Sequence, residues 1–453
     1  VGHGRGAAYG ASLASLLTFA SWDVTREYYV NDAGRQMDIL GLSTWLRYLE
    51  QHGINVPFLP NAYQGSYVRD MAGQITVAHG DKYVRPANAV LAGTPGLPDA
   101  ERADDEAKRQ RDQHLDALIA NAKELLGADW AYVHQHALSE QLADCRDDLE
   151  QFGVHFDVWF SEKALFDTGL VARCVDLLEK SGHLYIQNGA RWFRSTTFGD
   201  EKDRVVQREN GLYTYFASDI AYHLNKFERG FDKVINIWGA DHHGYISRVN
   251  GAITALGLDA SKLQVALVQF AVLYRNGQKA SMSTRSGEFV TLRELRSEVG
   301  NDACRFFYAL RKSDQHLDFD LDLAKSQTNE NPVYYIQYAH ARICSVISQW
   351  AGDLDGLAES DLALLTNPRE LALANQLAEF REVIEGAARE LAPHLIAFYL
   401  KELAGEFHGW YNAERMLVDD AALKDARVAL AVAVRQVIRN GLAILGVSCP
   451  ESM

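Results

Sequence analysis

The stretch Gly2-His-Gly-Arg-Gly6 predicts a tight turn that opens a helix, and the elements after it indicate the class of the fold. Alanine and leucine residues follow at helical spacing from Ala7 to Phe19. The segment from Asp23 to Val30 is rich in β-branched and aromatic residues and ends at Asn31-Asp-Ala-Gly34, as strands do. A glycine turn, a helix and a strand in this order form half of a doubly wound α/β unit.

The α/β alternation returns after residue 205. It resumes at Tyr213 to Tyr215, passes through a helix over Ile220 to Phe227 and reaches an apolar strand over Lys233 to Trp238. A second apolar strand, Leu263 to Phe270, precedes a polar loop from Ser281 to Gly287. These elements predict the second half of the same parallel sheet.

Changes of pattern along the chain predict four domains. Beyond Pro332 the strand signals vanish, and helical periodicity appears over Tyr334 to Trp350, Asn375 to Leu391 and Asp425 to Leu445. Between the two α/β segments lies a region with glycine, proline, a charged stretch and mixed helices and short strands. The predicted domains are the first half of an α/β domain (1–87), an inserted domain (88–205), the second half of the α/β domain with the polar loop (206–330), and a helical C-terminal domain (331–453).

The composition is that of an acidic globular protein. The 453 residues carry 45 Lys and Arg against 60 Asp and Glu, a formal net charge of −15, so any nucleic acid must be recognised selectively. The 5 scattered cysteines have no Cys-x-x-Cys spacing and fit a reducing cytoplasm. We find no apolar run of membrane-spanning length without charges, and expect a soluble protein. The first residue, Val1, is no initiator Met, which suggests a truncated N-terminus.

Two motifs lie where α/β proteins bind ligands. Gly2 and His3 stand at a helix N-terminus, where main-chain N–H groups and an imidazole can meet phosphate oxygens. Asp241-His242-His243 follows the strand that ends near Trp238, at the carboxyl end of the predicted sheet. A simple turn is the alternative for the first motif. A metal site is the alternative for the second, although adjacent histidines lack the usual spacing of zinc ligands.

A pair of side chains on one helix is suited to a cation. Tyr215 and Asp219 are four residues apart, hence on one face if Tyr215 opens the helix. A carboxylate pairs bidentately with a guanidinium, and an aromatic ring can lie against its flat surface. The alternative is an acidic residue that only stabilises the helix dipole. Farther on, Lys279 and the hydroxyls of the loop from Ser281 to Gly287 could clamp a triphosphate, or form a plain solvated loop.

Taken in this order, the motifs resemble those of class I aminoacyl-tRNA synthetases, and their amino-acid sequences are similar to those of the arginyl-tRNA synthetases. The matching stretches are Val1 to Ala7, Tyr28 to Gln36, Tyr215 to His223, Trp238 to Gly244, Met282 to Gly287 and Gln337 to Arg342. The resemblance implies a catalytic domain with a Rossmann-like parallel sheet and an inserted α+β connective domain, followed by an all-α anticodon-binding domain. It also implies that residues 206–330 carry the signature loop and a stem-contact region. It implies ATP-dependent activation of L-arginine to arginyl-adenylate and transfer to the 3′ end of tRNA(Arg), with release of AMP and pyrophosphate. It also implies that activation requires bound tRNA.

The resemblance implies roles for individual residues. Val1, Gly2 and His3 match the last three positions of the first class I signature, His-x-Gly-His, so His3 would stabilise charge on the α-phosphate. Ser281 to Arg285 match the Lys-Met-Ser-Lys-Ser signature without either lysine. The residues implied in catalysis are Gly2, His3, Lys279, Ser283, Thr284 and Arg285. The residues implied to bind arginine are Tyr215, Asp219, His242, Asn31 and Gln36. The residues implied to bind ATP are Gly2, His3, Gly239, Asp241, Met282 and Ser283. The implied tRNA contacts are Tyr334, Tyr338, Arg342, Trp410, Tyr411 and Asn412, for which helix packing is the alternative.

We therefore expect a monomeric cytoplasmic enzyme whose substrates are L-arginine, tRNA(Arg) and ATP with Mg²⁺, with no tightly bound cofactor, no bound metal and no membrane association. Two other readings stay open. A non-catalytic tRNA-binding relative would explain the missing signature lysines, but would have no reason to keep Tyr215, Asp219 and His242 together. A nucleotidyltransferase that forms an adenylate without tRNA would leave the helical C-terminal domain unexplained.

Overall fold

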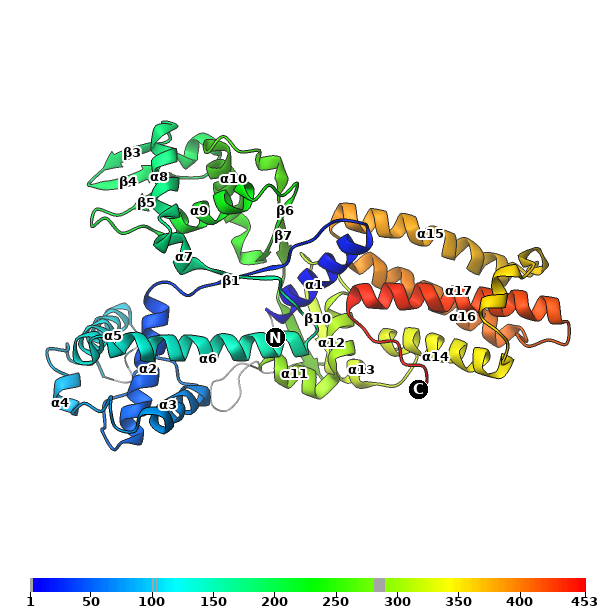
Figure 1. Cartoon of the computed structure of the whole chain (residues 1–453), viewed down its shortest axis with the longest axis horizontal. Coiled ribbons are helices and arrows are strands. Elements are labelled where there is room, and N and C mark those ends of the chain that lie inside the picture. Colours follow the sequence, from blue (N-terminus) through cyan, green and yellow to red (C-terminus); the bar gives the residue numbers. More distant parts are fainter. Residues whose placement is uncertain (1–2, 100–101, 103, 281–289) are drawn as a thin grey trace. The chain divides into compact units, whose positions relative to one another are not determined.

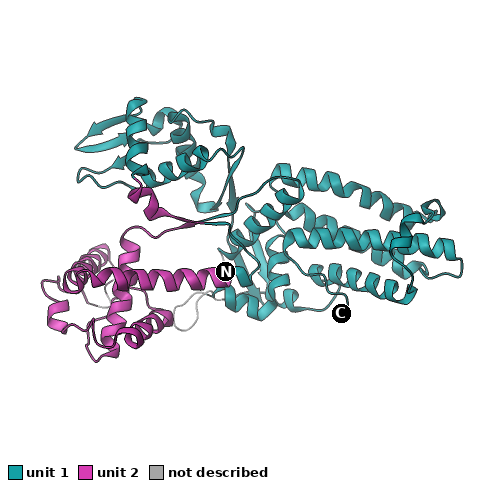
Figure 2. Ribbon diagram, in the orientation of Figure 1, with its two compact units in different colours: residues 1–28, 149–158, 169–453 teal, residues 29–148, 159–168 magenta. Residues whose placement is uncertain are grey.

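The computed structural model describes residues 3–99, 102, 104–280 and 290–453. The chain divides into two compact units, coloured separately in Figure 2. The first unit comprises residues 1–28, 149–158 and 169–453, and the second comprises residues 29–148 and 159–168. The chain leaves the first unit twice, within β1 (Glu27–Val30) and within β2 (Val158–Ser161).

The second unit is built mainly from helices around its own core. Trp45 and Tyr48 are fully buried on one helix, and their polar atoms reach main-chain carbonyls: Trp45 Nε1 donates to Tyr83 at 2.9 Å and Tyr48 Oη to Gly80 at 2.6 Å. Each buried aromatic ring thus has its polar end satisfied. The helices are α2 (Arg35–Gln51), α3 (Ser66–His79), α4 (Ala87–Val90), α5 (Asp105–Leu126), most of α6 (Asp129–Gln151) and α7 (Glu162–Asp167).

Two pairs of strands in the first unit run parallel, as the doubly wound pattern predicts. β6 (Val234–Gly239) runs parallel to β7 (Leu263–Val268), and β8 (Ala271–Arg275) runs parallel to β10 (Leu317–Asp320), with β9 (Gln278–Lys279) antiparallel beside β8. Among the described residues these pairs form separate sheets rather than one continuous sheet.

The first helix, α1 (Gly4–Phe19), packs closely on β6. A Cβ atom at Gly10 would lie 2.8 Å from Ile237 Cδ1, the end of a side chain that is 36% exposed, so glycine leaves room for this side chain between the helix and the strand. Gly4 to Gly6, which the sequence placed in a turn, are thus already the first residues of a helix that packs against a parallel strand, and Gly2 lies outside the described residues.

The segment that follows the inserted region begins a helix two residues beyond a short bridge. Tyr213 pairs with Gln207, and α9 (Tyr215–Glu228) starts two residues later. Thr214 stands between them in an extended conformation, and its hydroxyl donates to the Val205 carbonyl at 2.8 Å. Around α9 lie α8 (Leu170–Lys180), the antiparallel strands β3 (Leu184–Gln187), β4 (Ala190–Phe193) and β5 (Arg204–Gln207), the 3₁₀ helix η2 (Ala240–Tyr245) and α10 (Ile246–Ala255).

The C-terminal part of the first unit is helical, as predicted (Figure 1). Short helices α11 (Leu292–Val299), α12 (Asn301–Tyr308) and α13 (Leu321–Lys325) precede the bundle of α14 (Pro332–Trp350), α15 (Pro368–Glu390), α16 (His394–Ala413) and α17 (Ala421–Leu445). Asn331 and Asn367 cap α14 and α15, each before a proline at the first helical position. These caps explain why both helices start where they do.

In the part of the chain that the structure describes, α17 alone is long and apolar enough to cross a membrane. The sequence analysis anticipated no such segment. Half of its most apolar window is buried inside the protein, where it packs against α14, α15 and α16. The apolar character of α17 is therefore explained by its central place in the helical bundle.

Candidate functional site

The start of α9 presents a carboxylate and an aromatic ring. Tyr215 is 67% exposed at the first helical position, and Asp219 is partly buried one turn later. The hydroxyl of Tyr245 donates a hydrogen bond to Asp219 Oδ2. Burial raises the pKa of Asp219, while the Tyr245 hydrogen bond and the charges of Lys226 and His242 act in the opposite direction. The helix therefore offers a half-shielded anionic group beside an exposed ring.

The end of β6 brings polar side chains to the same place. Gly239 ends the strand, and a Cβ atom there would collide with the Asp241 carboxylate, so glycine allows Asp241 to fold back over the strand end. Asp241 and His242 are exposed, with 3.9 Å between Asp241 Oδ2 and His242 Nε2. The Trp238 ring lies edge-on to both the His242 and the Tyr245 rings, with centroids 6.4 and 5.8 Å away. His242, whose charge acts on Asp219, thus lies near the Tyr245–Asp219 contact, with Asp241 beside it, and Tyr215 stands one turn before Asp219 on the same helix.

A chain of buried polar groups supports α9 from behind. His223 Nδ1 donates to the main-chain carbonyl of Asp219 at 2.7 Å, and its Nε2 accepts from Asn236 Nδ2 at 2.6 Å. Asn236 Oδ1 in turn accepts from Lys226 Nζ at 2.8 Å. Burial lowers the pKa of His223 to about 3 and that of Lys226 to about 8. His223 is therefore neutral, with its proton on Nδ1, and links α9 to β6.

These supporting residues were missed at the level of sequence. The signal was the polar Asn236 in the middle of an otherwise apolar strand, which only a buried partner can satisfy. Tyr245 gave no signal, because an aromatic residue after a glycine is common in any loop.

His3 stands just before α1, exposed, with its ring centroid 5.3 Å from that of Phe270. Arg5 anchors the start of the helix: its buried guanidinium donates to the carbonyls of Gln269 at 3.0 Å, Gln315 at 2.7 Å and Lys312 at 2.9 Å. Burial lowers the pKa of Arg5 to about 10, so the group stays charged at neutral pH. The anchor therefore fixes the position of His3 relative to the segment that follows β7.

Of the remaining residues of the predicted triphosphate site, the structure describes Lys279 alone. Lys279 is exposed in the short strand β9. Gly2, Ser281, Met282, Ser283, Thr284 and Arg285 lie outside the described residues.

Asn31 and Gln36 belong to the second unit. Asn31 is exposed, and Gln36 Oε1 accepts a hydrogen bond from Tyr63 Oη at 3.4 Å. Their neighbour Asp32 caps the start of α7: its carboxylate accepts from Ser161 Oγ at 2.6 Å and from the Lys163 main-chain N–H at 2.8 Å. Asp32 thus has a structural role within its own unit.

A second cluster lies between α14 and α16. The Arg342 guanidinium stacks against the rings of Tyr338 and Tyr411, at 4.4 and 4.8 Å from their centroids, and Arg342 Nη1 lies 3.4 Å from Asn412 Oδ1. Tyr334 stacks on Tyr338 with a centroid distance of 5.9 Å. We call these five residues, 334, 338, 342, 411 and 412, the tyrosine–arginine cluster.

Trp410 is not part of this cluster. Its side chain is fully buried and packs edge-on to Phe407, so it belongs to the core of the helical bundle. His408, which was not selected from the sequence, does reach the cluster: its Nδ1 accepts from Arg342 Nη1 at 3.2 Å, and its Nε2 donates to the Tyr335 carbonyl at 3.1 Å.

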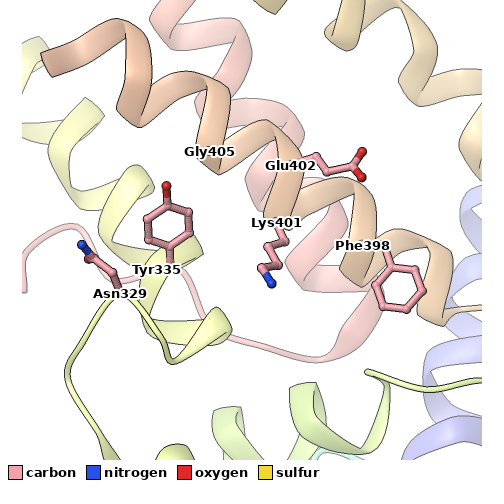
Figure 3. Close-up of a pocket in the computed structure, with 6 residues that line it drawn as sticks. All are labelled: Asn329, Tyr335, Phe398, Lys401, Glu402 and Gly405. Atoms are coloured by element: carbon pink, nitrogen blue, oxygen red, sulfur yellow. The ribbon is translucent and has the colours of Figure 1, made fainter. Parts of the chain in front are cut away.

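The same two helices, α14 and α16, also line a pocket. Figure 3 shows Tyr335 from α14 and Lys401 from α16 facing the pocket. Asn329, Phe398, Glu402 and Gly405 complete its lining.

Within the described ranges, no group of three or more His, Cys, Asp or Glu side chains could hold a metal ion.

Known proteins resemble this chain throughout. Residues 105–343 match the catalytic domain of class I tRNA synthetases (R), and residues 336–453 match the DALR anticodon binding domain. The arginine–tRNA ligase of Dechloromonas aromatica (strain RCB) is 90% identical over 453 residues, which are 100% of this chain and 77% of that protein. This chain belongs to the arginine–tRNA ligase family.

Other members of the family agree. The arginine–tRNA ligase of Azoarcus sp. (strain BH72) is 75% identical over 454 aligned residues, covering 100% of this chain and 77% of that protein. The crystal structure of a proposed arginyl-tRNA synthetase from Campylobacter jejuni is 31% identical, has a TM-score of 0.85 and covers 100% of this chain and 90% of that one. Membership confirms the predicted family, the class I catalytic fold and the helical anticodon-binding domain. The four domain boundaries and the residue roles stay predictions.

Proposed function

We propose that Asp219 is the residue with which this chain, an arginine–tRNA ligase, recognises the arginine side chain. The observation that carries the assignment is the partly buried Asp219 carboxylate, one turn behind the exposed Tyr215 ring and beside the end of β6. A guanidinium can donate two parallel hydrogen bonds to such a carboxylate while its flat face lies against the phenol. The charge of Asp219 selects a cation, and its fork geometry selects a planar one.

The reaction takes two steps, in each of which one bond forms and one breaks. The carboxylate of arginine attacks the α-phosphorus of ATP, pyrophosphate leaves, and arginyl-adenylate forms. A ribose hydroxyl at the 3′ end of the tRNA then attacks the activated carbonyl, and AMP leaves. Class I synthetases use ATP as a substrate, and we propose that it enters here with Mg²⁺.

In the first step, positive potential is needed at the α-phosphate. His3 and the N-terminus of α1 supply an imidazole donor and main-chain N–H groups, and the Arg5 anchor holds both in place. Gly239 and Asp241, at the exposed end of β6, are suited to the ribose of ATP, and His242 to the α-amino end of arginine. Gly2 and the stretch Ser281 to Arg285, with Lys279, complete the proposed phosphate site.

For the tRNA, we propose that the tyrosine–arginine cluster contacts unpaired bases. Its phenols offer ring faces for stacking, and Arg342 and Asn412 offer donors and acceptors. Acidic side chains outnumber basic ones in residues 331–453, so recognition here rests on placed groups rather than on a basic field. We further propose a monomeric protein that works in the cytoplasm.

ATP–pyrophosphate exchange tests the proposal. The protein is assayed with arginine, lysine or citrulline, each with and without tRNA(Arg), at a stated salt concentration. We expect exchange with arginine when tRNA is present, and none with the other two amino acids. Equal exchange with lysine, or tRNA binding without any exchange, would reject the proposed reaction.

A further inference from the structure

The contact between Tyr245 and Asp219 is held from several sides. Tyr245 ends η2, and its ring lies edge-on to Trp238 and Phe216, with centroids 5.8 and 6.1 Å away. The guanidinium of Arg248 lies 4.8 Å above the same ring. The Tyr245 hydroxyl is therefore aimed at Asp219 Oδ2 by packing on β6, α9 and α10, not by the hydrogen bond alone.

The other charged groups around α9 are engaged elsewhere. Arg248 and Arg204 both pair with Asp200, with Nε–Oδ2 distances of 3.1 and 2.8 Å. Lys226 is bonded to Asn236, and His223 is neutral. The ionic groups on the elements packed against α9 that have partners there or act on Asp219 are Arg173 of α8, paired with Glu228; Arg204 of β5 and Arg248 of α10, paired with Asp200; Glu27 of β1, paired with Arg229; and His242 of η2, beside Asp241. The same elements also carry the buried thiol Cys174 of α8, His243 of η2, and Asp176, Glu179 and Lys180 of α8.

A partly buried carboxylate needs a donor to stay ionised. Burial favours the neutral acid, which can no longer accept two hydrogen bonds from a guanidinium. A phenol that donates to one lone pair of Oδ2 stabilises the ionised form. It leaves Oδ1 and the second lone pair of Oδ2 for the substrate.

We propose that Tyr245 is a specificity-determining residue for arginine: its hydroxyl holds the Asp219 carboxylate ionised and oriented for the guanidinium. This inference rests on the proposed function, since it assumes that arginine binds at Asp219. The exposed motif Asp241-His242-His243-Gly244 then has a further role, because it lies in η2, the short helix that places Tyr245 next to α9.

The test is Tyr245→Phe, which removes one oxygen and keeps the ring and its packing. The KM for arginine and kcat are measured in tRNA-dependent exchange between pH 6 and pH 8.5. Loss of a hydrogen bond to a charged group corresponds to roughly tenfold or more in affinity. We expect the KM to rise about tenfold at pH 6 and the difference to shrink as the pH rises, because Asp219 then ionises without help.

Tyr399→Phe is the matched control, because Tyr399 also donates a phenolic hydrogen bond, to the Gln376 carbonyl at 2.8 Å in the helical bundle. It should leave the pH profile of the arginine KM unchanged. A KM for Tyr245→Phe that equals the wild-type value, or that is raised by the same factor at every pH, overturns the inference. Asp219→Asn tells a failure of the Tyr245 inference from a failure of the proposed arginine site. If this substitution leaves the KM for arginine unchanged, arginine does not bind at Asp219.

Discussion

Arg305 Nε in α12 donates a hydrogen bond to the main-chain carbonyl of Leu445 at the end of α17, with an N–O distance of 3.1 Å. The same buried guanidinium reaches the Gly153 carbonyl at 3.1 Å and Ser12 Oγ on α1 at 3.3 Å. Burial lowers the pKa of Arg305 to about 10, so it remains a cation. One side chain thus joins the first helix of the catalytic region to the last helix of the anticodon-binding domain.

Replacing this cation should be costly. Arg305→Leu leaves buried carbonyls without donors, and we expect a loss of about 3 kcal/mol in the free energy of unfolding, seen as a lower midpoint in thermal or urea unfolding. The control is Arg381→Leu, whose exposed pair with Glu385 lies on the surface of α15 and should contribute less than about 0.5 kcal/mol. Equal losses of stability for the two substitutions would show that the buried hydrogen bonds of Arg305 do not stabilise the fold.

The packing of α1 on β6 gives a second prediction. Gly10→Ala places a Cβ 2.8 Å from Ile237 Cδ1, which belongs to a side chain that is 36% exposed and can turn away, so the loss of stability should stay below about 1 kcal/mol. Ile237→Val removes the clashing methyl, so the double variant should recover most of that loss. Gly6→Ala on the same helix has open space at its Cβ and should not lower stability. Additive effects of Gly10→Ala and Ile237→Val in unfolding experiments would refute the proposed contact.

The neutral His223 makes stability depend on pH. Its pKa is about 3 in the folded protein and 6.5 when unfolded, so the unfolded state binds the extra proton between these values. Stability should therefore fall as the pH drops below 6.5, by up to about 1.4 kcal/mol per unit from this residue. His223→Gln should remove that part of the slope between pH 6.5 and 4.5 in denaturant titrations. An unchanged slope would mean that His223 is protonated in the folded state.

The sequence sufficed for the parts of the site that lie close together along the chain. Tyr215 and Asp219 share one helical face because they are four residues apart, and α9 does start at Tyr215. Tyr245 is 26 residues from Asp219, and Arg305 is 140 from Leu445, so no local pattern reveals either pair. Trp410 shows the opposite difficulty: a buried core ring and a base-stacking ring look alike in a sequence.

The tyrosine–arginine cluster yields a prediction about RNA affinity. Arg342→Gln removes the cation between Tyr338 and Tyr411, and we expect tRNA(Arg) affinity to fall about tenfold, at constant salt, in filter-binding or anisotropy titrations. The matched control is Arg389→Gln, the same charge change at an exposed position of α15. An equal loss for both would point to general electrostatics rather than to a specific contact.

Arginylation of tRNA(Arg) by Asp219→Asn tests directly whether Asp219 recognises arginine, because this substitution keeps the shape of the side chain and removes its charge. We predict that kcat/KM for arginine falls at least 100-fold, roughly the 3 kcal/mol that a hydrogen-bonded charge pair contributes, while the Kd for tRNA(Arg) stays within twofold of wild type. A kcat/KM for arginine close to the wild-type value would contradict the assignment of Asp219 as the residue that recognises arginine.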